Sequence, residues 1–201
     1  MITYAQSHSY TPKKWDLSGL QGISDKTLEV HFGLYEGYVK NVNLLNERLG
    51  SLRGSDQAKG SDPAYAELVR RLGFEYNGMR LHEYYFDNMT SKPKPIGPGK
   101  LHEALGVAFG GFDEWKKDFA AVAGMRGIGW AIAYRDPVAG RITNHWIGDH
   151  ELGHPAGFTP IVVLDVWEHA FILDYKPADK AKYVEAFLAN VDWDACESRL
   201  T

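Results

Sequence analysis

The chain of 201 residues is long enough to bury a core, as one domain or as two small ones. Its 44% hydrophobic and 24% charged residues are typical of a globular protein, and its formal net charge of -4 argues against a general nucleic-acid binder. No apolar run predicts a membrane span, the first residues show no secretory signal, and the single cysteine, Cys196, fits the reducing cytoplasm where we expect the protein.

The first half of the chain predicts a helical hairpin preceded by an extended arm over residues 1–22. Ser24 is a candidate N-cap for a helix that continues toward Leu49. After a polar loop, apolar residues at helical spacing predict a second helix from about Pro63 to Met89. The proline-rich segment Ser91–Gly99 is the expected linker.

The second half mixes helical and strand patterns. The expected helices cover residues 100–109, 111–124, about 167–174 and 180–190, and the expected strands cover residues 127–135, 141–147 and 161–164. We therefore predict an α+β fold. An N-terminal antiparallel helical hairpin occupies residues 1–92, and a C-terminal mixed domain with a three-stranded antiparallel sheet and helices occupies residues 97–201.

Four residues are candidate metal ligands. Asp165 follows an apolar strand, and His169 lies four residues later, so the two side chains can converge at a strand-to-helix turn. His31 and His82, one on each hairpin helix, can face each other. Three imidazoles and one carboxylate suit iron, manganese or zinc. The spacing alone favours ordinary core or surface histidines.

The full stretch Asp-Val-Trp-Glu-His-Ala-Phe-Ile-Leu-Asp-Tyr at residues 165–175 resembles the C-terminal signature of the iron/manganese superoxide dismutases. Further similarities extend over roughly residues 10–195, among them Tyr38-Val-x-Asn-x-Asn, Tyr84-Tyr85-Phe86 and Gly127-Ile-Gly-Trp130. The resemblance implies that one iron or manganese ion, with a slight preference for iron, converts superoxide to O2 and H2O2. The implied ligands are His31, His82, Asp165 and His169. Because zinc has no second accessible oxidation state, this activity would exclude it.

The resemblance also points to a partner for the metal-bound solvent. Many family members use a glutamine from either of two positions, but Gly78 occupies one position here and no glutamine fills the other. His150, fifteen residues ahead of Asp165, resembles the histidine-bearing variant of the family. We expect His150 to hydrogen-bond the solvent, with His145 and His154 as weaker candidates. An exposed loop histidine is the alternative interpretation.

The substrate gate departs from the family pattern. Tyr38, the expected gate tyrosine, follows His31 by seven residues instead of eight, which predicts a helix without a π-bulge. Either Leu34 or Tyr35 replaces the second gate histidine. Ile172 stands where the family has a tyrosine that reaches this histidine across the dimer, so both halves of that contact are missing together.

The family likeness further implies a homodimer, or a tetramer, in which Glu168 bonds His169 of the other subunit. The aromatic residues expected around the metal are Tyr85, Phe86, Trp130 and Trp167. Two other functions stay open at this point. One is a non-catalytic structural or interaction module with the same fold. The other is a metal-dependent hydrolase, for which Tyr38 and His150 offer the only candidate general bases.

Overall fold

The computed structural model describes residues 9–200. The first eight residues of the expected arm therefore lie outside the described residues. Helix α1 (Asp25–Gly54) is uninterrupted α-helix and runs past the predicted end at Leu49. Ser24 caps it as predicted, because its hydroxyl accepts a hydrogen bond from the backbone N–H of Thr27 at 3.1 Å. The absence of a π-bulge in this helix is confirmed.

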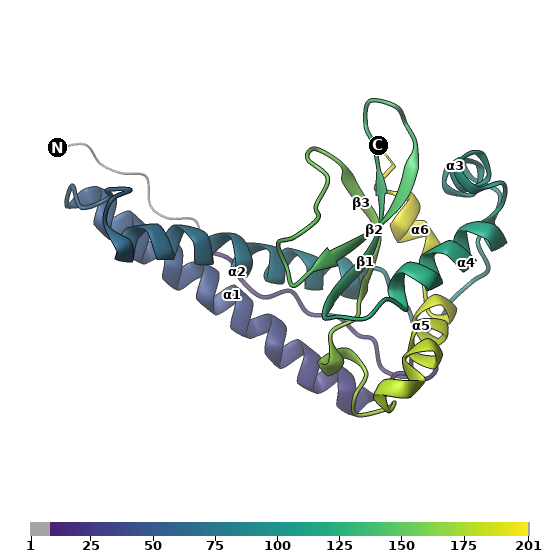
Figure 1. The fold of residues 1–201 in the computed structure, drawn as a ribbon. Helices are drawn as coiled ribbons and strands as arrows, with labels where there is room; N and C mark the ends of the chain where they lie inside the picture. Colours follow the sequence, from purple (N-terminus) through teal and green to yellow (C-terminus); the bar gives the residue numbers. More distant parts are fainter. Residues whose placement is uncertain (1–8, 201) are drawn as a thin grey trace.

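Helix α2 (Pro63–Asp87) begins behind Asp62, whose carboxylate accepts hydrogen bonds from the first two free backbone N–H groups. Figure 1 shows that α1 and α2 run antiparallel as a long hairpin, with the N-terminal part of α1 close to the rest of the protein. The predicted helical hairpin is therefore confirmed.

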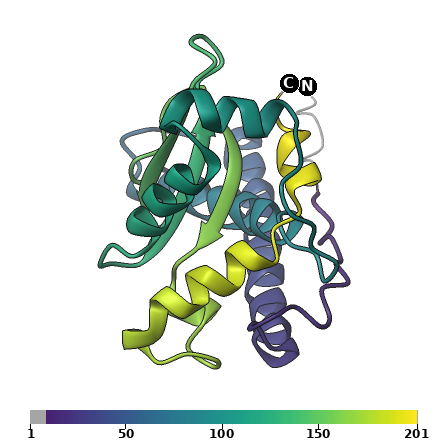
Figure 2. The same cartoon turned by 90° about the vertical axis from the view of Figure 1, so that its right-hand side faces the viewer.

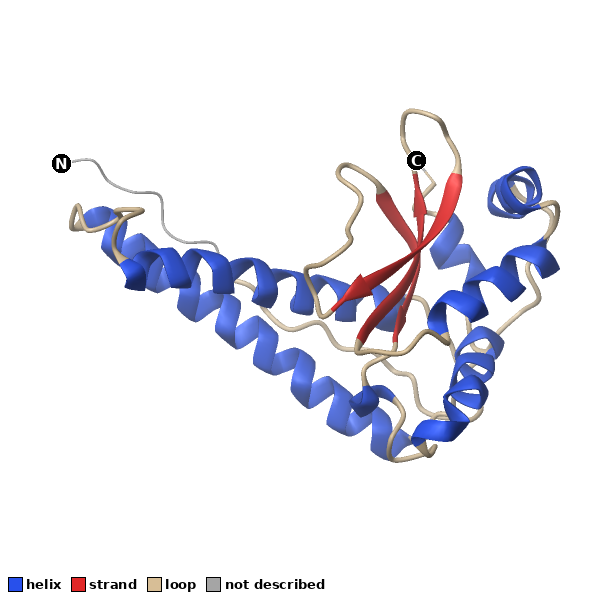
Figure 3. Ribbon diagram, viewed as in Figure 1, coloured by secondary structure: helices blue, strands red, loops and turns tan. Residues whose placement is uncertain are grey.

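The sheet has three antiparallel strands, as predicted (Figure 3). Their order is β2-β1-β3. The strands are β1 (Gly129–Arg135), β2 (Ile142–Gly148) and β3 (Thr159–Asp165). In the register of the sheet, Trp130 lies opposite Ile147 on one side and Asp165 on the other. The start of β1 and the end of β3 therefore lie side by side at one end of the sheet, where the ring of Trp130 contacts that of His82 on α2.

The sheet lies between the hairpin and the helices of the second half of the chain (Figures 1 and 2). Helix α2 packs on β3, and α4 (Phe112–Ala123) packs on β1 and β2. The remaining α-helices are α3 (Lys100–Phe109), α5 (Lys180–Ala189) and α6 (Trp193–Glu197). Helix α6 was not predicted. A single buried core joins both halves of the chain, and the division into residues 1–92 and 97–201 stays a prediction.

The predicted helix at residues 167–174 is wrong. The structure has a single 3-10 turn there, η1 (Glu168–Ala170), followed by further turns and a second short 3-10 segment, η2 (Pro177–Asp179). Phe171 leaves helical geometry with φ of -143°, and its buried ring packs against Tyr183 at 5.3 Å. Burial of this ring overrides the local helical pattern.

Within residues 9–200, no helix is both long and apolar enough to cross a lipid bilayer.

Candidate metal centre

Four polar side chains from four separate elements meet where the hairpin joins the sheet. His31 lies in the first two turns of α1 and His82 near the end of α2, whereas Asp165 ends β3 and His169 is part of η1. One potential ligand atom from each residue lies within 4.8 Å of the others. The structure thus brings the whole predicted ligand set together.

The local chain geometry explains why Asp165 and His169 converge. The carboxylate accepts a hydrogen bond from the backbone N–H of Trp167 through Oδ1 at 2.8 Å, which turns the chain directly after β3. The 3-10 turn then carries His169 back, so that its Nε2 lies 3.3 Å from the other carboxylate oxygen, Oδ2. A turn, rather than the predicted helix, brings together these two side chains that are four residues apart.

The distances within the cluster suit a metal ion. Oδ2 of Asp165 lies 3.1 Å from Nε2 of His31, 3.6 Å from Nε2 of His82 and 3.3 Å from Nε2 of His169. Metal–nitrogen and metal–oxygen bonds are about 2.0–2.2 Å long. When the ligand–metal–ligand angle lies between a right angle and a trigonal angle, such bonds place neighbouring ligand atoms roughly 3.0–3.6 Å apart. One ion therefore fits between these atoms.

The tautomer of His82 leaves a lone pair without a partner. Its Nδ1 lies 2.6 Å from the carbonyl oxygen of Gly78, and a carbonyl only accepts, so Nδ1 carries the proton. In the neutral ring, Nε2 is then an acceptor; it is buried and has no hydrogen-bond partner among the described residues. A buried, unpaired acceptor that faces a carboxylate is costly unless a cation lies between them.

Burial and neighbouring charges shift the pKa values of the four cluster residues. Burial alone would raise the pKa of Asp165, but the adjacent His169 and His31 lower it far below its usual range. Burial lowers the pKa of His31, and burial together with His31 lowers that of His82. Near neutral pH, His31 and His82 are therefore neutral beside a carboxylate, and these are the forms that bind metal. At His169, burial is outweighed by the charge and the hydrogen bond of Asp165, which raise its pKa, so metal binding there would displace a proton.

Aromatic rings enclose the cluster, as expected from the sequence. Ring centroids are 5.1 Å apart for Tyr85 and His31, 5.0 Å for Phe86 and His31, 5.0 Å for Trp130 and His82, and 5.8 Å for Trp167 and His169. The side chains of His31, His82 and Asp165 are completely buried, whereas that of His169 is 23% exposed. The rings exclude water from most of the cluster, and His169 marks its accessible edge.

Beside the cluster, a hydrogen-bonded series joins Trp130, His150 and Tyr38. The indole N–H of Trp130 donates to Nδ1 of His150 at 3.0 Å, so in the neutral imidazole Nε2 carries the proton. This Nε2–H lies 2.7 Å from the hydroxyl oxygen of Tyr38, which accepts. Burial lowers the pKa of His150 to about 4, and burial followed by the charge of Asp165 raises that of Tyr38 to about 12.

This pattern has a chemical consequence for Tyr38. Its hydroxyl stays protonated near neutral pH and accepts from His150, so its own O–H remains available to donate to a third group. His150 is fully buried, which argues against the interpretation as an exposed loop histidine. Both of its ring nitrogens already have protein partners, so these contacts leave no free ring nitrogen for the expected bond to a metal-bound solvent, which stays a prediction. Tyr38 is the member of the pair whose O–H is still free to donate.

Gly78 and Phe74 position this pair, and the sequence did not single out either role. A Cβ at residue 78 would lie 2.5 Å from Cδ1 of Tyr38, so the ring occupies the space that a side chain would need. Phe74 packs on His150 with ring centroids 4.6 Å apart. The spacing of Phe74, Gly78 and His82, four residues each, could have shown that all three share one face of α2.

The two candidates for the second gate position have different surroundings. Tyr35 is fully buried, and its hydroxyl donates to Glu83 and accepts from the backbone N–H of Lys13. Leu34 is 39% exposed, and Ile172 is 45% exposed. Of the two candidates, Leu34 is thus the one that is exposed at the surface, and its place in the gate stays a prediction.

The two weaker histidine candidates have partners outside the metal cluster. Nδ1 of His154 is 2.6 Å from the hydroxyl of Tyr134, and its Nε2 is 2.9 Å from the backbone carbonyl of His150. His145 bonds the hydroxyl of Thr143. No hydrogen bond within residues 9–200 links either ring to Tyr38 or to the four-residue cluster.

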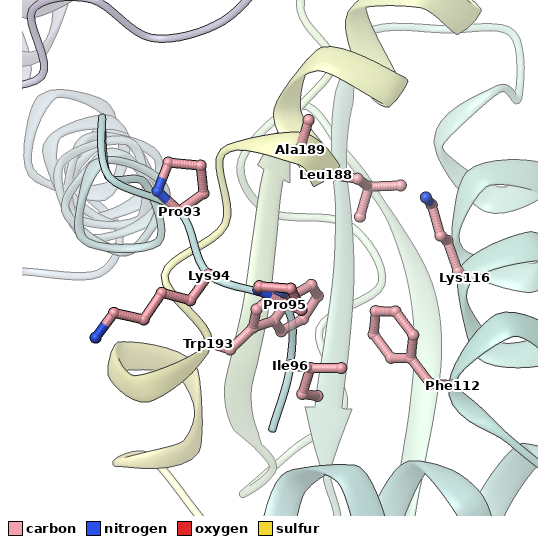
Figure 4. A pocket seen from close by; sticks show the side chains of 9 residues that line it. All are labelled: Pro93, Lys94, Pro95, Ile96, Phe112, Lys116, Leu188, Ala189 and Trp193. Atoms are coloured by element: carbon pink, nitrogen blue, oxygen red, sulfur yellow. The ribbon is translucent and has the colours of Figure 1, made fainter. Parts of the chain in front are cut away.

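A separate surface cavity of about 440 Å³ lies between the linker and the C-terminal helices, with the rings of Pro95, Phe112 and Trp193 around it (Figure 4). None of the residues that line it belongs to the cluster or to the Tyr38–His150 pair. This cavity is therefore distinct from the candidate metal centre.

Comparison with known proteins supports the same interpretation of the cluster. Residues 97–199 match the family of iron/manganese superoxide dismutases, C-terminal domain. The chain is 35% identical to a superoxide dismutase [Fe] of Aquifex pyrophilus over 90% of its length and 85% of the relative's. It is 35% identical to a superoxide dismutase [Fe] of Saccharolobus solfataricus, over 89% of this chain and 85% of the relative. It is 32% identical to a superoxide dismutase [Mn] of Haloferax volcanii, over 96% of this chain and 95% of the relative.

Proposed function

Because this chain belongs to the iron/manganese superoxide dismutases, we propose that it converts two superoxide ions and two protons to O2 and H2O2 at one iron or manganese ion. The proposed ligands are His31, His82, Asp165 and His169. The observation that carries the assignment is the unpaired, buried Nε2 of His82, which faces Oδ2 of Asp165 at 3.6 Å. Family membership makes the protein an oxidoreductase rather than a non-catalytic module.

The bound metal would supply the electron chemistry, since an ion that alternates between +2 and +3 can oxidise one superoxide and reduce the next. The protein would supply position and protons. Tyr38 holds a proton on its hydroxyl oxygen, and His150 fixes that oxygen by donating to it at 2.7 Å. We propose that this pair delivers a proton to the reduced substrate, with the aromatic rings keeping bulk water away.

The experiment that tests the function compares protein loaded with iron, manganese or zinc. Loading with iron or manganese should give rapid loss of superoxide with one H2O2 formed for every two superoxide ions, and iron is slightly favoured as the more active form. The zinc-loaded protein is the matched control, because zinc can occupy a mixed nitrogen and oxygen site without changing oxidation state. Equal activity in all three forms, or none in any, would contradict the proposal.

We further propose that the protein works as a homodimer through Glu168 and His169. Glu168 is exposed, and His169 is the one cluster residue whose side chain is partly exposed. Leu34 on α1 and Ile172 just after η1 add exposed apolar surface, and these two elements are in contact. A carboxylate from a second copy could bond Nδ1 of His169 and so orient the ligand. A tetramer and the cytoplasmic location also stay predictions.

Replacing Glu168 with alanine should therefore weaken both self-association and metal retention. Outer carboxylates of this kind contribute about 10–100-fold to metal affinity. Sedimentation equilibrium and metal analysis after dialysis measure the two effects. Glu185, an exposed glutamate on α5, provides the control, and Glu185→Ala should change neither. A wild-type protein that sediments as a monomer at micromolar concentration while fully active would refute the dimer.

A further inference from the structure

The side chains of His154 and Tyr134 have no role in the chemistry described above, yet they are bonded directly to the segment that carries His150. Tyr134 lies in β1 and is buried, and its hydroxyl is 2.6 Å from Nδ1 of His154. On the opposite edge of the same ring, Nε2 of His154 is 2.9 Å from the backbone carbonyl of His150. One imidazole thus connects the sheet to the main chain at His150.

The direction of these bonds follows from the chemistry of the partners. A carbonyl oxygen only accepts, so Nε2 of His154 carries a proton and donates it. In the neutral ring, Nδ1 is then an acceptor and receives the hydroxyl proton of Tyr134. Because the bond ends on the backbone of His150 and not on its ring, it cannot pass a proton to the His150–Tyr38 pair. The bond from His154 can therefore act only on the position of the His150 main chain.

The backbone around His150 is a place where such a constraint matters. The turn after β2 is closed by paired hydrogen bonds between Gly148 and Leu152, at 2.8 and 3.0 Å. Asp149, inside this turn, has φ of +50°, a left-handed conformation that residues with a side chain adopt less readily than glycine. Relaxation of Asp149 would rotate the following peptide and carry the ring of His150 with it.

The ring of His150 tolerates little movement, since it is bonded at both nitrogens, to Trp130 on β1 and to Tyr38 on α1. We propose that His154, itself fixed by Tyr134, is a positioning residue that holds the main chain of His150 so that its ring spans Trp130 and Tyr38. The consequence for catalysis rests on the function proposed above, whereas the structural effect does not.

The test observes the Trp130 indole N–H directly, by proton–nitrogen NMR on zinc-loaded protein with ¹⁵N-labelled tryptophan, with the signal assigned through Trp130→Phe. His154→Phe removes the bond to the His150 carbonyl. It should shift the Trp130 signal and speed its exchange with water about tenfold, which corresponds to the loss of one ordinary hydrogen bond. His154→Gln should keep the wild-type signal, because its amide N–H can still donate to the carbonyl.

His145→Phe is the matched control, because the His145 ring packs edge-on against the same tyrosine, with centroids 5.5 Å apart, without a bond to His150. It should leave the Trp130 signal unchanged. An unchanged signal in folded His154→Phe, or an equal change in His145→Phe, would overturn the proposal. If His154→Phe does not fold, Tyr134→Phe replaces it and should also speed the exchange; unchanged exchange there overturns the proposal equally.

The outcomes separate this inference from the proposed function. Wild-type protein without dismutase activity, but with the expected NMR changes, would refute the function and leave the role of His154 intact. Active wild-type protein whose Trp130 signal ignores His154 would refute the positioning role alone. In active protein, His154→Phe should also lower turnover, and His154→Gln should restore it.

Discussion

Replacing Asp165 with alanine should abolish tight binding of iron or manganese and, with it, dismutation of superoxide. Oδ2 of Asp165 is the one atom that lies within 3.6 Å of the Nε2 atoms of His31, His82 and His169. Without it, the cluster loses its only carboxylate, which faces the completely buried His31 and His82. Because even outer partners of metal ligands are worth about 10–100-fold, the loss of turnover should exceed about 100-fold.

Metal analysis of purified protein and the rise in melting temperature on adding manganese measure this effect. Wild-type protein should gain stability from the metal by mass action, and Asp165→Ala should not. His82→Ala should behave in the same way. The control is Asp113→Ala on α4, which removes one exposed carboxylate far from the cluster in the chain. Normal metal content and normal turnover in Asp165→Ala would remove these residues as the ligands.

Replacing His150 with alanine should lower turnover by about 10–100-fold while leaving the metal bound. Alanine cannot accept from Trp130 or donate to Tyr38, so the Tyr38 hydroxyl loses the bond that fixes it at 2.7 Å. Glutamine can make both bonds, with its oxygen accepting from the indole and its amide N–H donating to the hydroxyl. His150→Gln should therefore retain most of the activity.

The glutamine variant should also change the ratio of activity between the iron and manganese forms, because an amide and an imidazole place different dipoles beside the site. Steady-state rates of superoxide consumption, measured for the iron form and the manganese form of each variant, give this comparison. His102→Ala, which removes an exposed histidine on α3, is the control and should match wild type. Wild-type turnover in His150→Ala would exclude the residue from the mechanism.

The sequence was most informative where the chemistry depends on local spacing. The capping residue Ser24, the hairpin helices and the strand before Asp165 follow from short patterns, and the family resemblance selected the four cluster residues. The predicted helix at 167–174 failed because the buried ring of Phe171 packs against Tyr183, a contact between residues that local periodicity does not register.

Contacts between distant parts of the chain could not be predicted in this way. The bond between His150 and Tyr38 joins residues 112 positions apart, and its geometry depends on the packing of α1, α2 and the loop after β2. The tautomer of His82 is set by the carbonyl of Gly78, a helix-interior oxygen that the sequence cannot mark. The family resemblance marked Gly78 only as a position without a glutamine side chain, and it could not show that the ring of Tyr38 fills this space.

The most direct test of the metal assignment is anomalous X-ray diffraction from crystals of the active protein, recorded on both sides of the iron and manganese absorption edges. We expect one peak per chain, at about 2.0–2.2 Å from Nε2 of His31, His82 and His169 and from Oδ2 of Asp165. An active protein whose anomalous peak lies elsewhere, or whose four side chains surround no metal, would contradict the account.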